Sequence, residues 1–272
     1  MTDRYAVIGQ PISHTKSPLI HGLFAEVTGQ DLQYSAIEGS LDDFTGDVRR
    51  FRDSGARGMN VTAPFKLQAF ELADVCSARA TLAKACNALK FADGKIYAEN
   101  FDGIGLLRDI QTNLELPLAG LNVLVLGAGG AVRGALLPLL EAGPARLVIA
   151  NRDQAKAHSL AAQVSDGCLH VCSYEQLPGQ SFDVVINATS ASLSGALPPI
   201  STAVFSQARL AYELTYGKGL TPFLTLAREA GVACIADGVG MLVEQAAEAF
   251  QWWRGMRPET RPVIDRLRVP LE

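Results

Sequence analysis

The stretch that decides the fold is LNVLVLGAGGAVRGALLPLL, residues 121–140. An apolar run, typical of a parallel strand buried on both faces, ends in Gly127-Ala128-Gly129-Gly130, and an apolar-periodic helix is expected to follow. Glycines at such a turn let a pyrophosphate approach the free N–H groups of the helix. The spacing departs from G-x-G-x-x-G, because Val132 holds the third position. An ordinary tight turn is the alternative, but the strand–turn–helix context favours a dinucleotide site.

The next expected strand, residues 145–150, ends in Asn151-Arg152-Asp153. NAD sites usually place a carboxylate here to hold the ribose 2′-hydroxyl, whereas NADP sites place a cation here for the 2′-phosphate. Arg152 offers a planar fork that matches a phosphate, and Lys156 follows one helical turn later. Asp153 would favour NAD if it faced the ribose, but not if its carboxylate caps the following helix. We therefore expect NADP, and secondary use of NAD stays open.

The composition excludes several classes of protein. The 272 residues include 24 Lys and Arg and 28 Asp and Glu, which gives a formal net charge of −4 without a basic block. This balance predicts binding to neither nucleic acid nor an anionic membrane. The five cysteines are an odd number without a C-x-x-C pair, so we expect no disulfide framework and no metal site. The start MTDRYAVIG lacks a signal-peptide pattern, and we expect a cytoplasmic monomer or homodimer.

Strands alternate with helices over residues 4–62 and again over residues 121–236, which indicates two doubly wound α/β units. We expect a boundary near Asp102, and a long helix ending at Trp253 that folds back onto the first unit. A substrate-binding and catalytic domain would then comprise residues 1–102 and 239–272, and a Rossmann-type nucleotide-binding domain residues 103–238. In detail we expect strands at 5–8, 32–37, 56–61, 121–126, 145–150, 183–187, 210–214 and 233–235, a hairpin of 87–91 with 95–98, and helices at 19–28, 41–53, 65–85, 103–112 and 221–230.

Polar side chains gather after the strands of the N-terminal half. Ligands of open α/β sheets bind outside the carboxyl ends of the strands, and hydroxyl and amide groups suit a small polyhydroxylated substrate. Taken singly, these residues are better explained as caps and turns, as for Ser17 before Pro18 and Thr62 before Pro64. As a set beside a nicotinamide domain they favour a substrate site. They are Thr15, Ser17, Asn60, Thr62, Lys66, Asn87, Asn100 and Asp102.

Lys66 and Asp102 are the pair most able to move a proton. Hydride transfer from an alcohol carbon requires the hydroxyl proton to leave, and a lysine with a lowered pKa can accept it. Burial lowers a lysine pKa while a nearby Asp raises it, and the sequence leaves the balance open. A surface lysine at a helix start is the alternative, which the helix dipole disfavours. His14 and His21 could also act as bases, but His21 has apolar neighbours and is more simply explained by packing.

At these residues the sequence closely resembles the shikimate dehydrogenase family over nearly the whole chain. The matching stretches are PISHTKSP (11–18), NVTAPFK (60–66), ACNALK (85–90), ENFDG (99–103), GAGGAVRG (127–134), NRDQAK (151–156), VINATS (185–190), residues 216–219 and DGVGMLVEQAA (237–247). The resemblance implies reversible NADPH-dependent reduction of 3-dehydroshikimate to shikimate, on the route to aromatic amino acids.

The resemblance also assigns roles to individual residues. It implies that Lys66 donates and accepts the proton, with Asp102 beside it on the ring hydroxyls. Thr15, Ser17 and Tyr216 would hold the substrate carboxylate, and Asn60, Thr62, Asn87 and Gln245 would line the rest of the pocket. The implied cofactor residues are Gly127, Ala128, Gly129, Gly130, Ala131, Asn151, Arg152, Lys156, Ala188, Thr189, Leu214, Gly238 and Met241.

The chain departs from the family pattern at Asp153, where the common NADP pattern has a neutral residue, and at three positions in the stretches implied to bind substrate. The usual Ser-x-Ser is Thr15-Lys16-Ser17, the usual Asn-Thr is Asn87-Ala88, and the usual Asn-Thr-Asp is Asn100-Phe101-Asp102. Phe101 either faces the substrate or packs away and braces the loop that aims Asp102. These departures leave quinate open as an alternative substrate, and a divergent paralogue as an alternative to the main pathway enzyme. A non-catalytic NADP-binding regulator is the remaining alternative, although it would be expected to lose Lys66 or Asp102, and both are present.

Overall fold

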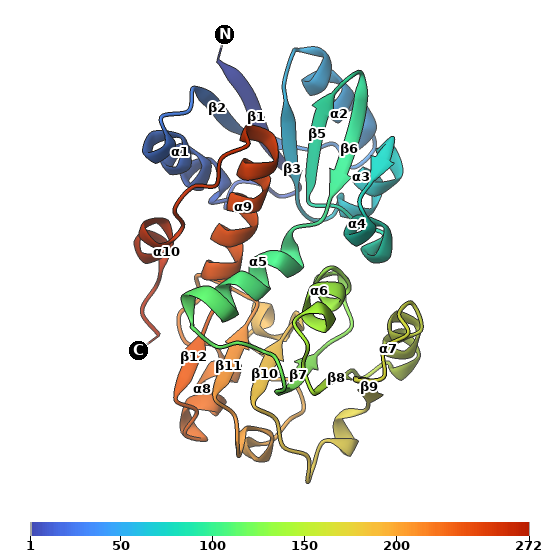
Figure 1. Cartoon of the computed structure of the whole chain (residues 1–272), viewed down its shortest axis with the longest axis vertical. Helices are drawn as coiled ribbons and strands as arrows, with labels where there is room; N and C mark the ends of the chain where they lie inside the picture. Colours follow the sequence, from blue (N-terminus) through green and yellow to red (C-terminus); the bar gives the residue numbers. More distant parts are fainter. Residues whose placement is uncertain (1, 272) are drawn as a thin grey trace. The chain divides into compact units, whose positions relative to one another are not determined.

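A computed structural model describes residues 2–271 of the chain, except for the side chain of Leu193. These residues form two compact units, residues 2–105 with 243–265 and residues 106–242 with 266–271. Each unit contains a six-stranded sheet flanked by helices, so the predicted α/β class is confirmed (Figure 1). The division into a substrate domain and a cofactor domain at residues 102 and 239 stays a prediction.

The sheet of the first unit is mixed rather than wholly parallel. Strand β5 pairs antiparallel with both β3 and β6, and the other neighbours pair in parallel. The β5–β6 hairpin turns through Asp93 and Gly94, both at positive φ, as the sequence predicts. The sheet order is β2-β1-β3-β5-β6-β4. The strands are β1 (Asp3–Gly9), β2 (Leu32–Glu38), β3 (Gly58–Val61), β4 (Val75–Cys76), β5 (Ala88–Ala92) and β6 (Lys95–Glu99).

Helices bury both faces of this sheet. On one face Ala6 and Ile8 of β1 join a core with Phe44 and Phe65, which come from α2 (Phe44–Asp53) and the start of α3 (Lys66–Leu72). On the other face Tyr5 stacks on Trp253 at 4.7 Å between ring centroids. Trp253 lies on α9 (Val239–Arg254), so this long helix completes the first unit, as predicted. The remaining helices that contribute to this unit are α1 (Ser17–Thr28), α4 (Ala78–Ala83), α5 (Asp102–Arg108) and α10 (Arg261–Leu267).

The predicted continuous helix over residues 65–85 is wrong. Helix α3 ends at Leu72, β4 follows and pairs with β6, and α4 starts only after Ser77. Asp74 accepts a hydrogen bond from the N–H of Ile96 (2.8 Å), and the Ser77 hydroxyl caps α4. Pairing with a strand distant in sequence thus overrides an apolar spacing that fits a helix. Strand β9 and helix α10 were not predicted, and residues 109–113 form a π-helical turn after α5.

The sheet of the second unit is parallel throughout and follows the order β12-β11-β10-β7-β8-β9. This is the arrangement of a Rossmann fold, and the strand order reverses between β7 and β10. Ligands bind at such a reversal, outside the carboxyl ends of the two strands. The strands are β7 (Asn122–Leu126), β8 (Arg146–Ala150), β9 (Leu169–Cys172), β10 (Val184–Asn187), β11 (Leu210–Glu213) and β12 (Cys234–Ala236).

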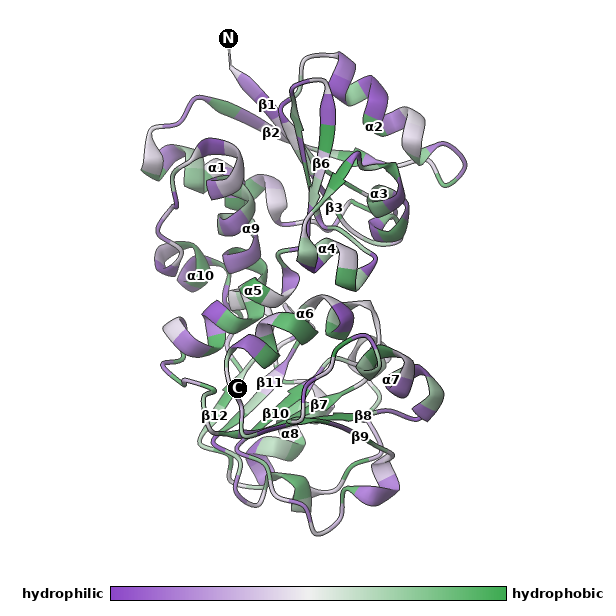
Figure 2. Ribbon diagram, turned by 45° about the vertical axis from the view of Figure 1, so that its right-hand side comes forward, coloured by the Kyte–Doolittle hydropathy of each residue, from purple (hydrophilic) through white to green (hydrophobic). Residues whose placement is uncertain are grey.

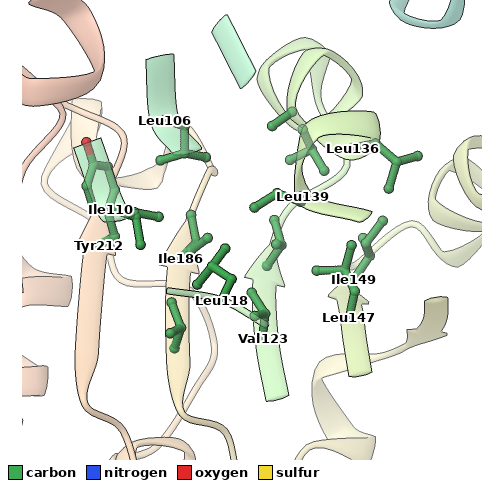
Figure 3. Packing of buried hydrophobic residues seen from close by; sticks show 14 of the residues in the cluster. Leu106, Ile110, Leu118, Val123, Leu136, Leu139, Leu147, Ile149, Ile186 and Tyr212 are labelled. Atoms are coloured by element: carbon green, nitrogen blue, oxygen red, sulfur yellow. The ribbon is translucent and has the colours of Figure 1, made fainter. Parts of the chain in front are cut away.

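Both faces of the second sheet are apolar, as parallel strands require. Leu136 and Leu139 of α6 (Gly130–Glu141) pack on one face against alternate residues of β7, β8 and β10, with Leu106 and Ile110 beside them (Figure 3). The opposite face packs on Phe223 of α8 (Pro222–Glu229). Figure 2 shows these strands mainly in hydrophobic colours. Helix α7 (Gln154–Ala161) follows β8.

Three features of the described part of the chain bear on function. Among residues 2–271 no helix combines the length and the apolarity needed to cross a membrane. Within the same residues no three His, Cys, Asp or Glu side chains are grouped as a metal ion would require. The five cysteines are free thiols.

Candidate functional site

Lys66 and Asp102 form an ion pair in the first unit. Each is the first residue of a helix, α3 and α5 respectively, that follows directly on a strand end or loop. The Lys66 Nζ lies 2.6 Å from the Asp102 Oδ2. The Lys66 side chain is 33% exposed and that of Asp102 is 11% exposed, so the ammonium is open to a ligand while the carboxylate is held inside. The pair can therefore exchange a proton with a bound molecule and keep its own geometry.

Asn87 orients the second oxygen of Asp102. Its Oδ1 accepts the N–H of Phe101 (2.9 Å), which fixes the amide so that Nδ2 points toward the site. The Nδ2 donates to Asp102 Oδ1 (2.8 Å) and to Gln245 Oε1 (3.1 Å). Asn100 Oδ1 also accepts the N–H of Asp102 (3.1 Å). Asp102 is thus held by a lysine, an amide and its own backbone before any substrate binds.

Asn60 extends this network to Tyr34 of β2. Its Nδ2 donates to the carbonyl oxygen of Asn87 (3.0 Å), and its Oδ1 accepts the hydroxyl of Tyr34 (2.7 Å). In the loop after β1, Thr15 Oγ1 donates to Ser17 Oγ (3.2 Å). Burial raises the pKa of Tyr34 well above 10.0, so its hydroxyl stays protonated as a donor. Tyr34 is a member of the site that the sequence does not reveal, because only the tertiary fold joins it to Asn60.

The structure shows whether two hydroxyl residues, Ser17 and Thr62, cap the helices that follow them. Neither α1 nor α3 has a side-chain cap, and their N-cap residues are Lys16 and Phe65. The alternative that Ser17 and Thr62 cap these helices is therefore wrong. Thr62 lies at the end of β3, where a Cβ on Gly9 would overlap its methyl group. Its hydroxyl remains available for a ligand at the carboxyl ends of β1 and β3, where the strand order of this sheet reverses.

His21 packs in the interior, as its apolar neighbours predict. It is 1% exposed and stacks on Tyr34 with 4.1 Å between ring centroids and 5° between planes. Burial lowers the pKa of His21 to about 3, so the imidazole is neutral at physiological pH. It serves as an aromatic support for Tyr34, not as a base exposed to substrate.

The second unit contains a pocket of 880 Å³ at the carboxyl ends of its strands. Gly127 adopts φ +109°, a conformation that favours glycine, and its backbone passes close to Ala188. Gly129 and Gly130 begin α6 and face open space, because a Cβ on either would meet nothing within 4 Å. The N–H groups of this helix start are thus accessible to an anion. The pocket residues that match the implied cofactor set are Gly127, Ala128, Gly129, Gly130, Ala131, Asn151, Arg152, Lys156, Ala188 and Thr189.

The position of Asp153 removes the sequence argument for NAD. Asp153 is the N-cap of α7, and its carboxylate accepts the N–H of Lys156 (3.1 Å). The Asn151 side chain donates to the Asp153 carbonyl oxygen (2.8 Å) and shapes the turn. Arg152 and Lys156 line the pocket with exposed side chains. An open helix start together with two cations therefore fits the pyrophosphate and the 2′-phosphate of NADP.

Buried networks support the remaining implied cofactor residues. Tyr212 donates its hydroxyl to Asp109 Oδ2 (2.7 Å) and accepts the N–H of Met241 (3.3 Å), which fixes the start of α9. A Cβ on Gly238 would overlap the carbonyl oxygen of Leu214, so these two implied residues are in close contact. Leu214, Gly238 and Met241 themselves lie outside the set that lines the pocket.

Comparisons with known proteins agree over the whole chain. Residues 7–89 match the shikimate dehydrogenase substrate binding domain, residues 110–195 the shikimate / quinate 5-dehydrogenase family, and residues 238–268 the shikimate 5′-dehydrogenase C-terminal domain. A shikimate dehydrogenase (NADP(+)) from Aromatoleum aromaticum is 54% identical over 99% of this chain and 98% of its own. The chain belongs to the shikimate dehydrogenase family.

Solved structures of similar proteins show the same fold. An Ael1 enzyme from Pseudomonas putida is 68% identical, with a TM-score of 0.98 over 99% of this chain and 100% of its own. A shikimate 5-dehydrogenase from Thermus thermophilus, solved with NADP(H) and shikimate, is 29% identical, with a TM-score of 0.86 over 97% of both chains.

Within this family member, the structure joins most of the predicted substrate residues by hydrogen bonds. One series joins Asn60, Lys66, Asn87, Asp102 and Gln245, and a separate pair joins Thr15 and Ser17. Tyr216 belongs to the second unit, on the loop after β11 with 40% of its surface exposed, and its role with the substrate stays a prediction.

Sequence reasoning missed part of the cofactor pocket. Tyr174 lies in the wall just after β9, and its position was hidden because that strand was not predicted. Beneath the loop after β10, the buried carboxylate of Glu213 accepts hydrogen bonds from Asn187 Nδ2 (2.9 Å) and Ser192 Oγ (2.5 Å). Burial raises the pKa of Glu213. The sequence carried no local signal for either residue, because the role of each depends on which strands lie side by side. The other missed wall residues are Ser190, Ala191, Ser194, Ala196, Leu197, Pro198 and Pro199.

Proposed function

We propose that this chain is an NADP-dependent oxidoreductase that reversibly reduces 3-dehydroshikimate to shikimate. The observation that carries the proposal is the Lys66–Asp102 pair at 2.6 Å, set in a chain of hydroxyl and amide side chains. Such a chain suits a small ring with several hydroxyl groups. NADP would supply or accept the hydride when bound, and the open start of α6 with Arg152 supports its binding.

We assign the proton to Lys66. In the reduction, the substrate carbonyl carbon gains a hydride and its oxygen gains a proton. The ammonium of Lys66 donates that proton and becomes a neutral amine, and in the oxidation the amine takes the proton back. Because a third of the Lys66 side chain is exposed, the amine can exchange its proton with solvent between turnovers.

Asp102 has a different task, since its carboxylate is held by Lys66 and Asn87. A carboxylate in this position accepts a hydrogen bond from a substrate hydroxyl and brings the reacting oxygen to the Lys66 Nζ. Asn87 and Gln245 keep the carboxylate aimed, because their amides are hydrogen-bonded to each other and Asn87 contacts Asp102. Fixed orientation of this kind is a large source of catalytic rate.

The hydroxyl groups of Thr15 and Ser17 are proposed to hold the substrate carboxylate, together with Tyr216. The two hydroxyls contact each other at 3.2 Å, so both can point to one anionic group. Asn60 and Thr62 would bind the ring hydroxyls. On the cofactor side, Arg152 and Lys156 would contact the 2′-phosphate, and the N–H groups at Gly129 and Gly130 the pyrophosphate.

The test is a spectrophotometric assay of the purified chain, following reduced-nicotinamide absorbance with shikimate or quinate and with NADP or NAD. The highest kcat/KM is expected for shikimate with NADP. A higher kcat/KM for quinate would replace the substrate assignment, and a preference for NAD would replace the cofactor assignment. NADP binding without turnover of either substrate would support a regulator in place of an enzyme.

We also propose that the protein acts in the cytoplasm, as a monomer or a homodimer. Its five free thiols support a reducing compartment. Light scattering coupled to gel filtration measures the mass against the 29.0 kDa of one chain.

A further inference from the structure

Three elements of the first unit each contribute one polar site residue and one buried apolar neighbour. At the start of β5, Asn87 is followed by a fully buried alanine. At the start of α5, Asp102 is preceded by a phenylalanine that is 4% exposed. On α9, Gln245 is followed one turn later by another fully buried alanine. The three apolar neighbours, Ala88, Phe101 and Ala249, pack together in one cluster, which we name the Phe101 plug.

The ring of Phe101 packs inside the unit and not toward the substrate. It meets Trp252 edge-on, with 5.8 Å between ring centroids and 73° between planes, and Ile104 also packs against the plug. Lys90 covers Trp252. The Lys90 Nζ lies 5.8 Å from the centroid of the Trp252 ring and 3.2 Å from the Trp252 carbonyl oxygen. The phenylalanine is therefore enclosed by β5, α5 and α9 together.

The backbone of Phe101 connects the plug to the site. Its N–H donates to Asn87 Oδ1 at 2.9 Å, and this bond leaves Asn87 Nδ2 to bind Asp102 and Gln245. A shift of the Phe101 ring moves this N–H and the adjacent Asp102 at the same time. The plug thus acts on the Lys66–Asp102 pair in two ways. Phe101 is covalently bonded to Asp102, and its N–H is hydrogen-bonded to Asn87, which in turn binds Asp102.

The small side chains of Ala88 and Ala249 leave the space that the Phe101 ring fills. Both are 0% exposed, so a larger side chain at either position must displace Phe101. Extra atoms in a filled core force side chains from their preferred rotamers and shift the backbone. Phe101 and Ala88, two positions where the chain departs from the pattern Asn-Thr and Asn-Thr-Asp, are therefore one matched pair.

We propose that Phe101 is a positioning residue: its ring, seated against Ala88 and Ala249, holds Asn87, Asp102 and Gln245 in the arrangement that keeps Asp102 on Lys66. The inference rests on the proposed function of that pair. It predicts that the plug determines turnover without touching substrate, and that the residue at position 88 must suit the residue at position 101.

The first test compares Phe101→Leu with Phe91→Leu, a buried phenylalanine of the same unit that packs in a different cluster. Phe101→Leu is expected to lower kcat for shikimate by about 10- to 100-fold and to move the pH profile of kcat, since misplacement near 1 Å costs about that much. The KM for NADP should stay unchanged, because the cofactor pocket belongs to the other unit. Phe91→Leu should lower thermal stability and leave kcat and its pH profile in place. If both variants behave alike, Phe101 is only a core residue and the inference fails.

The second test is a double-mutant cycle of Ala88→Thr and Phe101→Thr. Ala88→Thr alone is expected to lower kcat about 10-fold by displacing the ring. The double variant should recover part of that loss relative to the product of the two single effects, since the smaller residue at 101 leaves room for the threonine. Multiplicative effects would show that the positions are independent and would overturn the pairing.

These outcomes separate the inference from the proposed function. If the unmodified chain does not turn over shikimate, the proposed function fails, whatever the variants do. If it does, and Phe101→Leu matches Phe91→Leu in kcat, pH profile and KM for NADP, only the plug is refuted.

Discussion

The two units present their functional groups in different ways. In the first unit the groups are side chains, and a hydrogen-bonded series runs from Lys66 through Asp102, Asn87 and Asn60 to Tyr34. In the second unit the anion-binding surface is largely backbone, at the glycine turn that begins α6, with exposed cations beside it. Interactions among buried, linked side chains are non-additive, whereas exposed charges act locally.

This difference predicts where substitutions matter. A change in the first unit should alter turnover, because each side chain orients the next. A change at an exposed cation of the second unit should alter the affinity for one part of the cofactor and leave turnover at saturating cofactor unchanged. The following predictions test that contrast, beginning with the largest expected effect.

Lys66→Met removes the proposed proton donor and should lower kcat by about 10²- to 10⁴-fold, the usual contribution of a general acid–base group. NADP affinity, measured by fluorescence titration, should be unchanged. Lys95→Met, at an exposed lysine of β6, serves as the matched control and should keep full activity. A Lys66→Met enzyme that retained most of its turnover would exclude this lysine from the proton transfer and erase the contrast between the units.

Arg152→Ala should weaken NADP binding by about 1.5–3 kcal/mol, the value of a hydrogen bond to a charged group. The KM for NAD should not change, since NAD lacks the 2′-phosphate, and kcat at saturating NADP should be retained. Arg133→Ala provides the control, because Arg133 lies on α6 of the same unit and does not line the pocket. Equal losses of NADP and NAD affinity would instead assign Arg152 a structural role.

The sequence predicted the central strands of both sheets because apolar runs and glycine turns are local signals. The run from Leu121 to Leu126 needs no partner to be recognised, and β7 occupies residues 122–126. Strands β4 and β9 are short and lie at sheet edges, where neighbours and not local pattern decide the conformation. The false helix over residues 65–85 has the same cause.

The site residues also divide into those that a local signal reveals and those that depend on neighbouring strands. Residues at the carboxyl end of a central strand or directly after it, such as Asn60 and Gly127, could be found from position alone. Tyr34, Tyr174 and Glu213 could not, because their roles depend on which strands lie side by side. Phe101 illustrates the limit: the sequence left two orientations open, and the packing of its ring on Ala249, a residue far along the chain, decides between them.

His21 gives a prediction for stability against pH in the first unit. Burial lowers its pKa to about 3 in the folded protein, against about 6.5 in an unfolded chain. Between these pH values the unfolded chain binds a proton that the folded protein does not. The contribution of His21 to the free energy of unfolding is therefore full above pH 6.5 and is lost as the pH falls toward 3. At pH 5 the loss is about 2 kcal/mol relative to pH 7.

Thermal unfolding of His21→Phe, measured from pH 7 to pH 5, tests this expectation. The variant keeps an aromatic ring on Tyr34 and should show a shallower decrease of melting temperature with acidification than the unmodified chain. His14→Gln, at an exposed histidine, should follow the unmodified chain. An identical pH dependence for His21→Phe and the unmodified chain would show that His21 is not held neutral by burial.

The smallest expected effect is that of Asp153→Thr, which asks whether the second unit selects its cofactor by repulsion as well as attraction. If the carboxylate faced the 2′-phosphate, its removal would raise the preference for NADP. Its hydrogen bond to the N–H of Lys156 instead makes it the cap of α7, and threonine is also a favoured cap. The ratio of kcat/KM for NADP to that for NAD should therefore change by less than about fivefold, since an exposed charge is worth at most about 1 kcal/mol. Asp153→Ala separates the two explanations: it removes the charge as threonine does but also the cap, and should lower the melting temperature while the cofactor ratio matches that of Asp153→Thr. A rise of the ratio well beyond fivefold in both variants would mean that the carboxylate opposes the phosphate. The second unit would then share with the first a dependence on the charge of a particular side chain.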